Sequence, residues 1–484
     1  MKRKNILTVA VSLALFSLVT SCASDDGNYD YTKLNELSIG DIETDYTIEQ
    51  NSELTISPSI TGTQGFNTED YDYKWFIYKA NSVALPDTIG REKELHATIS
   101  LSPSEYDLVF RVIDRNNGLF AQKKVNVNVV NSYSNGVAVL SDVDGYADLA
   151  FINSIGRVTE NAYETINGRK AGKGPMGIYY TGGHTSQKLL VISTQDSCFA
   201  LEPISMEYML NHNKMMFYFP SAKGLTQGFA ASSSHFSEYI VVDGGVYKRS
   251  FWDEVPLLKF NTKMGGDYVA SPYILANDNN VFIYDTKGKR FLFDDYYDWG
   301  ELVGTPDNPY FNAADMKMDM LYGTCYEKSD MSEVRAVMKD NDGNVYGISG
   351  QKDLTWGDNY EQYVKLIPTG KVQFDKEGTG NATCYALSSQ DLNFMYCAVG
   401  NKIICISMKT GNIISTYTMP EGTIDHMEFD DTDSPDILYV GTSDGSKSAN
   451  SGSVYYLQMQ SDGTLSLQKS FKNICGKVVD FVYK

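Results

Sequence analysis

The chain has few of the side chains that most often build catalytic sites. Its 484 residues include five histidines: His96, His184, His212, His235 and His426. The one Gly-x-Ser-x-Gly motif, at 441–445, leads into a polar loop, and no histidine follows it, so it does not predict a hydrolase nucleophile with its base. His-Glu-x-x-His and His-x-x-x-His spacings are both missing, which excludes the usual zinc peptidase motifs. We therefore expect no enzymatic activity, no cofactor and no metal site.

Cysteine pairs of the Cys-x-x-C type are absent as well. Apart from Cys22, the cysteines are Cys198, Cys325, Cys384, Cys397, Cys405 and Cys475. Most lie inside apolar runs with strand character, which favours buried thiols over disulfides. Cys384 and Cys397 are the pair to test first for a disulfide.

Basic residues are in deficit. After residues 1–21, which carry three basic and no acidic side chains, 38 basic residues face 61 acidic ones, a net charge of −23. A surface of this sign does not suit nucleic acid and instead favours solubility.

Only one long apolar run exists, and it lies at the start of the chain. Lys2 to Lys4 are basic, residues 6–19 are apolar but short for a membrane span, and Thr20-Ser21 lead into Cys22. This pattern predicts a lipoprotein signal peptide over residues 1–21 and acylation of Cys22, which would anchor the protein to a membrane. The alternative is an ordinary secretory signal with a chance cysteine at its end.

The rest of the chain predicts an all-β protein of two domains. Residues 22–36 have the composition of a tether. Residues 37–131 alternate in period two, with Trp75 placed to fill a core and Tyr106 opening a late strand, which indicates an immunoglobulin-like sandwich.

Residues 132–484 contain no convincing long amphipathic helix and show seven strand-rich segments instead. These begin near Val137, Leu189, Tyr239, Ile274, Val337, Met395 and Ile437, on average 50 residues apart. Such repeats favour a β-propeller of about seven blades over a second pair of sandwiches. Residues 477–483 are predicted to complete the blade begun by residues 136–140 and so to close the ring.

Hairpin turns are expected at 277–280, 340–344, 400–401 and 443–445. Asp340, Asp342 and Asn344 also resemble the start of an EF-hand loop. Val345 stands where that loop needs glycine, so a turn is the better interpretation and incidental calcium the alternative.

Several segments together resemble a known family. They are Gly27-Asn28-Tyr29-Asp30-Tyr31, Tyr73-Lys74-Trp75, the strands 99–101 and 106–114, residues 136–140 and residues 144–149. This set is similar to the PKD-like family lipoproteins of Bacteroidetes, and Ala23-Ser24-Asp25-Asp26 resembles their signal for export to the cell surface. Phe76-Ile77 after Trp75 departs from the Gly-Asp-Gly turn of true PKD domains, which puts PKD-type ligand binding in doubt.

The resemblance implies an outer-membrane lipoprotein, exposed on the cell surface, that accompanies a TonB-dependent transporter and its lid lipoprotein. Such a protein would serve as an accessory or ligand-binding subunit in the uptake of oligosaccharides or peptides. Two alternatives remain open: a surface propeller hydrolase or lyase that acts on a polymer, and a purely structural subunit of the importer.

Aromatic loops are the candidates for binding a ligand or partner. Their rings stand beside hydrogen-bonding side chains and are Tyr296, Tyr297, Trp299, Trp356 and Tyr360, with Trp252 as a weaker candidate. Flat rings in polar loops suit stacking on sugars or on a partner. The alternative is that they pack at blade edges. We expect Trp299 and Trp356 to contribute most.

We predict that Cys22→Ala leaves the protein folded but not anchored, because the acyl chains are the one membrane attachment that the sequence indicates. Fractionation of cells lacking the transporter partner measures this. Mutant protein in the membrane pellet at the wild-type level would contradict the lipoprotein assignment.

Overall fold

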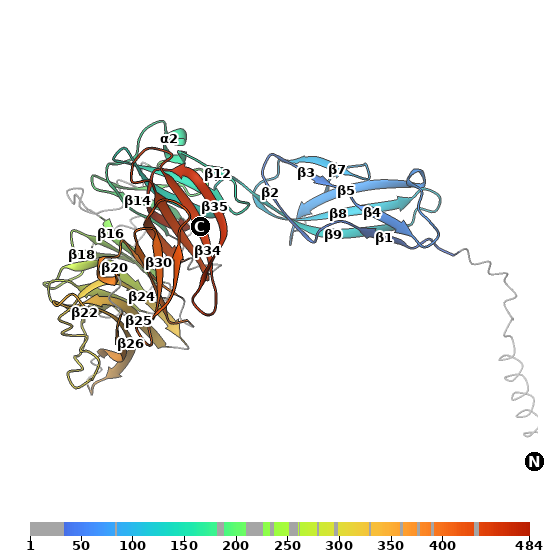
Figure 1. Ribbon diagram of the computed structural model, residues 1–484. Coiled ribbons are helices and arrows are strands. Elements are labelled where there is room, and N and C mark those ends of the chain that lie inside the picture. Colours follow the sequence, from blue (N-terminus) through green and yellow to red (C-terminus); the bar gives the residue numbers. More distant parts are fainter. Residues whose placement is uncertain are drawn as a thin grey trace, which may run out of the picture. The chain divides into compact units, whose positions relative to one another are not determined.

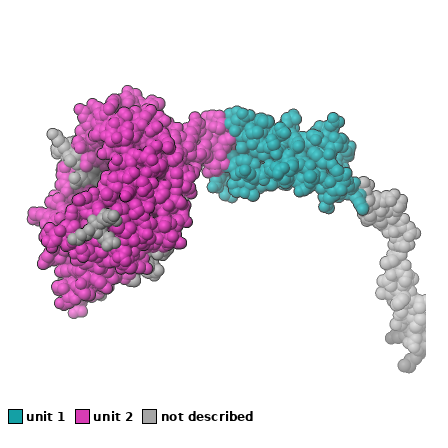
Figure 2. All heavy atoms as spheres, viewed as in Figure 1, with its two compact units in different colours: residues 1–46, 53–98, 105–127 teal, residues 47–52, 99–104, 128–484 magenta. Residues whose placement is uncertain are grey.

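The computed structural model describes most of the chain. The described residues are 33–82, 85–181, 188–209, 226–232, 237–250, 260, 262–277, 280–294, 299–328, 331–358, 362–374, 378–388, 392–429 and 435–484. The chain forms two compact units, residues 1–46, 53–98 and 105–127 in one and residues 47–52, 99–104 and 128–484 in the other (Figure 2). Cys22 lies outside the described residues.

The first nine strands form the predicted sandwich. A five-stranded sheet has the order β2-β9-β8-β5-β6, and two short ladders pair β1 with β4 and β3 with β7. The elements are β1 Leu37–Gly40, β2 Asp45–Glu49, β3 Ser52–Ile56, β4 Ser59–Gly62, η1 Thr68–Asp70, β5 Tyr71–Lys79, β6 Asp87–Gly90, β7 Leu95–Ile99, β8 Ser104–Asp114 and β9 Phe120–Val130.

Trp75 fills the centre of this sandwich, as its alternating strand predicted. Its side chain is fully buried, its ring lies 4.2 Å from that of Phe110, and its indole N–H donates to the Glu92 carbonyl at 3.1 Å. A buried indole needs such an acceptor, so the hydrogen bond holds the ring in one orientation.

The remaining strands form seven antiparallel sheets, the blades of a β-propeller (Figure 1). Blade 1 contains β36 Lys477–Tyr483, β10 Gly136–Val143, β11 Tyr146–Asn153 and β12 Val158–Thr159, and the helix α2 Ala162–Asn167 follows it. In blade 2, the described residues form three strands, β13 Pro175–Thr181, β14 Leu189–Thr194 and β15 Cys198–Leu201.

Blades 3 to 7 each have four strands in chain order. Blade 3 is β16 Thr226–Ser232, β17 Ser237–Val242, β18 Gly245–Ser250 and β19 Thr262–Lys263; blade 4 is β20 Ala270–Ala276, β21 Val281–Asp285, β22 Arg290–Asp294 and β23 Trp299–Glu301. Blade 5 is β24 Asp319–Lys328, β25 Met331–Lys339, β26 Val345–Trp356 and β27 Gln362–Gln373. Blade 6 is β28 Tyr385–Leu387, β29 Phe394–Val399, β30 Lys402–Ser407 and β31 Ile413–Thr418, preceded by η2 Thr379–Asn381; blade 7 is β32 Thr423–Phe429, β33 Ile437–Ser443, β34 Gly452–Met459 and β35 Leu465–Cys475.

Each of the seven segments predicted from the sequence belongs to a different blade. The second strands of blades 2, 3, 4 and 7 are buried at every position, because each blade packs between two others. The outermost strand of blade 6, β31, instead alternates between partly buried and exposed residues. The pattern of buried and exposed residues in each strand therefore depends on the position of that strand in its blade.

The innermost strands form a closed ring. Neighbouring contacts run from β13 through β16, β20, β24, β28 and β32 to β36, and β36 contacts β13 again. The ring is closed by pairing of β36 with β10, with Val139 opposite Phe481. This confirms the predicted closure, and Phe481 is 3% exposed in the resulting core.

The predicted turns at 340–344, 400–401 and 443–445 lie between successive strands, whereas residues 278 and 279 of the turn predicted at 277–280 lie outside the described residues. Asp340 begins the turn of the β25–β26 hairpin. Its carboxylate accepts hydrogen bonds from the backbone N–H groups of Asp342 at 3.0 Å and Asn344 at 2.8 Å. Such bonds are typical of an Asx turn, and they explain why Asp and Asn residues are frequent in this segment.

Cysteines of the propeller are present as thiols, and four of the six are buried: Cys325, Cys397, Cys405 and Cys475. Burial raises the pKa of the Cys397 thiol to about 12, so this side chain behaves as an apolar core residue. Within the described residues, no helix is both long and apolar enough to cross a membrane.

We predict that Phe481→Ala lowers the free energy of unfolding by about 3–5 kcal/mol, because it leaves a cavity where β36 packs. Leu467→Ala, at a side chain that is 49% exposed, should change it by about 0.5 kcal/mol or less. Chemical denaturation of both variants measures the contrast. Equal effects would show that the closing strand is not needed for stability.

Candidate ligand-binding site

Trp299 is a packed residue of blade 4. It begins β23, its indole N–H donates to the Gly265 carbonyl at 2.8 Å, and its ring lies 5.6 Å from that of Tyr268. The side chain is partly buried against the core formed by blades 3 and 4. Its role in ligand binding stays a prediction, and its location is that of a blade-edge aromatic residue.

Trp356 is much more exposed. It ends β26, pairs with Gln362 across the β26–β27 hairpin and is 59% exposed. Leu354 and Tyr363 of the same hairpin are 38% and 41% exposed. Trp299 and Trp356 thus lie on two different blades. The other predicted binding residues, Tyr296, Tyr297, Tyr360 and Trp252, lie outside the described residues.

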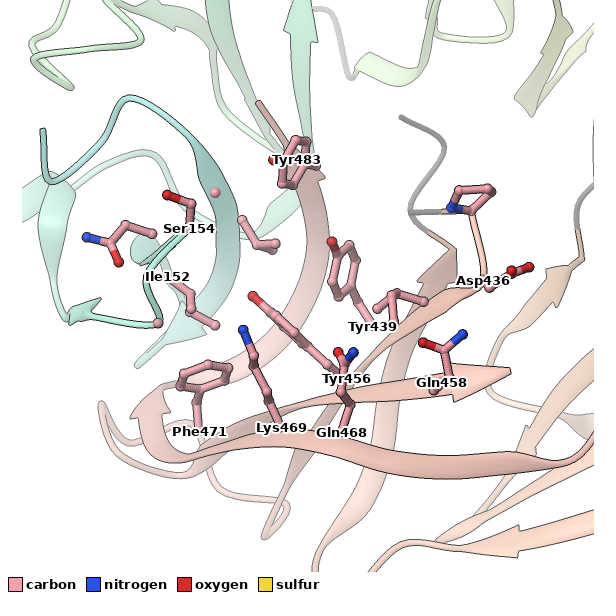
Figure 3. A pocket seen from close by; sticks show the side chains of 16 residues that line it. Ile152, Ser154, Asp436, Tyr439, Tyr456, Gln458, Gln468, Lys469, Phe471 and Tyr483 are labelled. Carbon is pink, nitrogen blue, oxygen red and sulfur yellow. The ribbon is translucent and has the colours of Figure 1, made fainter. Parts of the chain in front are cut away.

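A pocket of about 490 Å³ lies where the ring closes, between blade 7 and blade 1 (Figure 3). Strands β33, β34 and β35 form one side, and β10, β11 and the turn after β11 form the other. The lining residues include the rings Tyr439, Tyr456, Phe471 and Tyr483, the amides Asn153, Gln458 and Gln468, and the charged side chains Asp436 and Lys469.

Strand pairing brings the aromatic rings together. Tyr439 and Tyr456 are directly opposite on β33 and β34, with ring centroids 4.8 Å apart in an edge-to-face arrangement. The Tyr456 ring also lies 5.3 Å from that of Phe471 on β35. Rings in these geometries stabilise one another and hold their faces in fixed positions.

An irregularity in β35 turns further polar groups into the pocket. Lys469 is opposite Tyr456, but Leu467 is opposite Leu457, so Gln468 is one residue extra on β35. A β-bulge of this kind changes the direction of side chains, and consecutive residues can then line the same space. Gln468 and Lys469 both do so, with Lys469 and Tyr456 directed into the hollow (Figure 3).

Glycine is required on the opposite side. Gly136 has φ of +148°, and a Cβ there would lie 2.2 Å from the Ile152 carbonyl oxygen. The close approach of β10 to β11 at this point therefore depends on the absence of a side chain.

The pocket can bind a ligand that is partly apolar and rich in hydrogen-bonding groups. Its rings offer faces for stacking, and its amides and Lys469 offer donors and acceptors around them. Reasoning from the sequence missed this site, since its two sides are about 300 residues apart in the chain and meet only after ring closure. The aromatic residues near the last predicted strand-rich segment, Tyr439, Tyr456 and Phe471, were the available signal.

A second polar group lies on the innermost strands. His426 and Glu428 of β32 face Asp480 of β36, with His426 Nε2 at 3.3 Å from Asp480 Oδ1 and 3.8 Å from Glu428 Oε2. Burial lowers the pKa of His426, but the two carboxylates raise it more, to about 10. Burial, and then the negative charge of Asp480, raise the pKa of Tyr179 on β13 well above its usual range.

These three residues are of the types that bind metal ions, and their candidate ligand atoms lie within 4.8 Å of one another. In the described part of the chain, this is the one group of three or more His, Cys, Asp and Glu side chains that could hold a metal ion. Sequence motifs could not find it, because its members lie on two strands that are far apart in the chain.

Comparison with known protein families supports the resemblance that the first part of the chain shows to the PKD-like family. The PKD-like family model matches residues 22–175, about a third of the chain, which confirms that part of the resemblance inferred from the sequence. No curated protein matches the chain.

The solved structures that are similar to this chain include three of low identity. A quinonprotein alcohol dehydrogenase-like protein from Bacteroides thetaiotaomicron is 12% identical, with 93% of this chain and 99% of that chain covered and a TM-score of 0.40. The Cps50 (Swd1) β-propeller domain of Myceliophteria thermophila is 8% identical, with 63% and 94% covered and a TM-score of 0.41. Kluyveromyces lactis Hsv2 is 9% identical, with 62% and 99% covered and a TM-score of 0.33. At these TM-scores, the assignment of the propeller depends on the strand pairing of this chain itself.

We predict that Trp299→Ala and Trp356→Ala differ in their effect on folding. Trp299→Ala should lower the free energy of unfolding by about 2 kcal/mol, because it removes a packed ring and its hydrogen bond. Trp356→Ala, at an exposed ring, should change it by about 0.5 kcal/mol or less. Thermal and chemical denaturation measure both, and the reverse order would contradict the packing described for these residues.

Proposed function

We propose that this protein is a non-enzymatic, lipid-anchored protein of the outer cell surface that binds a nutrient for a TonB-dependent importer. It would act beside the transporter and its lid lipoprotein, as an accessory subunit that first holds the ligand. The signal ending at Cys22 and the acidic residues after it support the location. The match of residues 22–175 to the PKD-like family is consistent with such a protein.

The pocket between blades 1 and 7 is the observation that carries the binding function. It combines four aromatic rings with three amides, which is the combination that sugar-binding sites use: rings stack on the apolar face of a sugar while amides bind its hydroxyls. A volume of about 490 Å³ suits a short oligosaccharide segment.

Charge favours a neutral ligand. Without residues 1–21 the protein carries a net charge of −23, and a strongly acidic surface repels anionic glycans. Among neutral nutrients, an oligosaccharide fits this lining better than a peptide, because ring faces and amides match the apolar faces and hydroxyl groups of sugars. We therefore propose a neutral oligosaccharide as the ligand.

Calorimetric titration with maltoheptaose, xylohexaose and mannohexaose tests this proposal. Phe471→Ala should weaken binding of the sugar that binds by about 30-fold, since a stacked ring contributes on the order of 2 kcal/mol. Gln468→Ala should also weaken binding, by about tenfold.

Gln460→Ala is the matched control. Gln460 follows β34, is exposed, bonds Gln458 O and Ser466 Oγ, and does not line the pocket. It should bind sugar as the unchanged protein does. If none of the three sugars binds but the protein co-purifies with the transporter, the purely structural role replaces the binding role. If a sugar is cleaved during the titration, the protein is an enzyme and the proposal is wrong.

A further inference from the structure

His426, Glu428 and Asp480 come together because of the way the ring closes. His426 and Glu428 are two residues apart on β32 and so point to the same face of that strand. Asp480 lies on β36, the innermost strand of the adjoining blade, and β32 contacts β36. The cluster therefore bridges blade 7 and blade 1.

A glycine on β33 lets β36 approach blade 7 closely at this position. Gly441 is the cross-strand partner of His426, and a Cβ there would lie 2.5 Å from the Cβ of Val478 on β36. Real Cβ atoms do not approach so closely, so a side chain at position 441 would push β36, and Asp480 with it, away from His426.

The distances within the cluster fit a small divalent ion. Two ligands that bind zinc at about 2.1 Å in tetrahedral geometry are about 3.4 Å apart. His426 Nε2 lies 3.3 Å from Asp480 Oδ1 and 3.8 Å from Glu428 Oε2, so small side-chain movements would bring all three atoms to a common ion.

The imidazole nitrogen has the geometry of an unused ligand. His426 Nε2 is itself inaccessible to solvent and makes no hydrogen bond with any group of the described residues, although two carboxylate oxygens are near it. This is expected if the nitrogen points between the two oxygens rather than at either one. A buried polar atom that makes no hydrogen bond is costly, and an ion bound at that point would replace the imidazole proton and interact with the nitrogen and both carboxylates.

Backbone groups hold the Asp480 carboxylate in place. Its Oδ2 accepts the Ile178 N–H at 2.9 Å, and its Oδ1 accepts the Phe481 N–H at 3.0 Å. Such bonds behind a carboxylate orient it toward a metal ion. Gly177 leaves room beside it, since a Cβ there would lie 3.3 Å from Asp480 Oδ2 and 2.4 Å from Tyr179 Oη.

An ion could reach the cluster from solvent. The side chains of His426, Glu428 and Asp480 are 27%, 44% and 18% exposed. Water could therefore complete the coordination of an ion held by three protein ligands.

We propose that His426, Glu428 and Asp480 bind one divalent transition-metal ion, with zinc as the best fit, across the seam where the propeller closes. One imidazole with two carboxylates favours Zn²⁺ or Mn²⁺, because Ca²⁺ and Mg²⁺ prefer an all-oxygen set. The ion would tie β32 to β36 and thereby stabilise the closed ring.

Zinc titration of the full chain tests the site. The protein is purified without a histidine tag, treated with EDTA, dialysed and titrated with ZnCl₂ by calorimetry. We expect one equivalent to bind and to raise the thermal midpoint. Replacement by Co²⁺ should give visible absorption bands typical of a site with four or five ligands.

His426→Gln and Glu428→Gln should each weaken zinc binding by more than about 100-fold and abolish the cobalt bands. Glu428 is the most exposed of the three ligands, so Glu428→Gln is the variant expected to remain folded if changes at the other two disturb closure. Its melting without metal verifies this.

His96→Gln provides the matched control. His96 also lies between two carboxylates, but Glu53 approaches its Nδ1 at 3.6 Å and Glu94 its Nε2 at 3.9 Å, so no single ion can bind all three. Zinc affinity should be unchanged in this variant. Absence of one-to-one zinc or manganese binding, or equal affinity in His426→Gln and the unchanged protein, would overturn the proposal and leave an imidazolium that pairs with two carboxylates.

Discussion

The pairing of β36 with β10 is the interaction on which the propeller depends. Without it, blade 1 would lack its innermost strand, and the ring of inner strands would end at β32 with nothing between it and β13. Closure also removes a free sheet edge at each end of the repeat. Each of the seven blades is therefore packed between two neighbours, with a separate cluster of buried side chains at each junction.

Both candidate sites lie across this same seam. The aromatic pocket has blade 7 on one side and blade 1 on the other, and the His426 cluster joins the inner strands of these two blades. Their chemistry differs: the pocket combines rings with amides, whereas the cluster combines an imidazole with carboxylates. A change that loosens closure would consequently disturb both, and only substitutions within one site can separate their roles.

The sequence was sufficient for the architecture because the signals that define it are local. Alternation around Trp75 predicted a sandwich strand, seven apolar segments predicted seven blades, and turn residues such as 340–344 marked the hairpins. The two candidate sites could not be predicted in this way, because they do not depend on local signals. The pocket depends on a bulge at Gln468 and on chain segments that meet only in the folded ring, and neither leaves a spacing that can be recognised. For Trp299, the sequence left both ligand binding and packing at a blade edge open. Its burial depends on packing against Tyr268, which is 31 residues away in the chain.

The closing contact also has a consequence for biogenesis. Gly476 donates its N–H to the Ser141 hydroxyl across a separation of 335 residues, so β10 leaves the ribosome long before its partner strand exists. During that interval, the edge of β10 that β36 will cover can pair with any other extended chain. Productive folding in the cell therefore requires that this edge be shielded, or that blade 1 form last, after the whole chain has been synthesised.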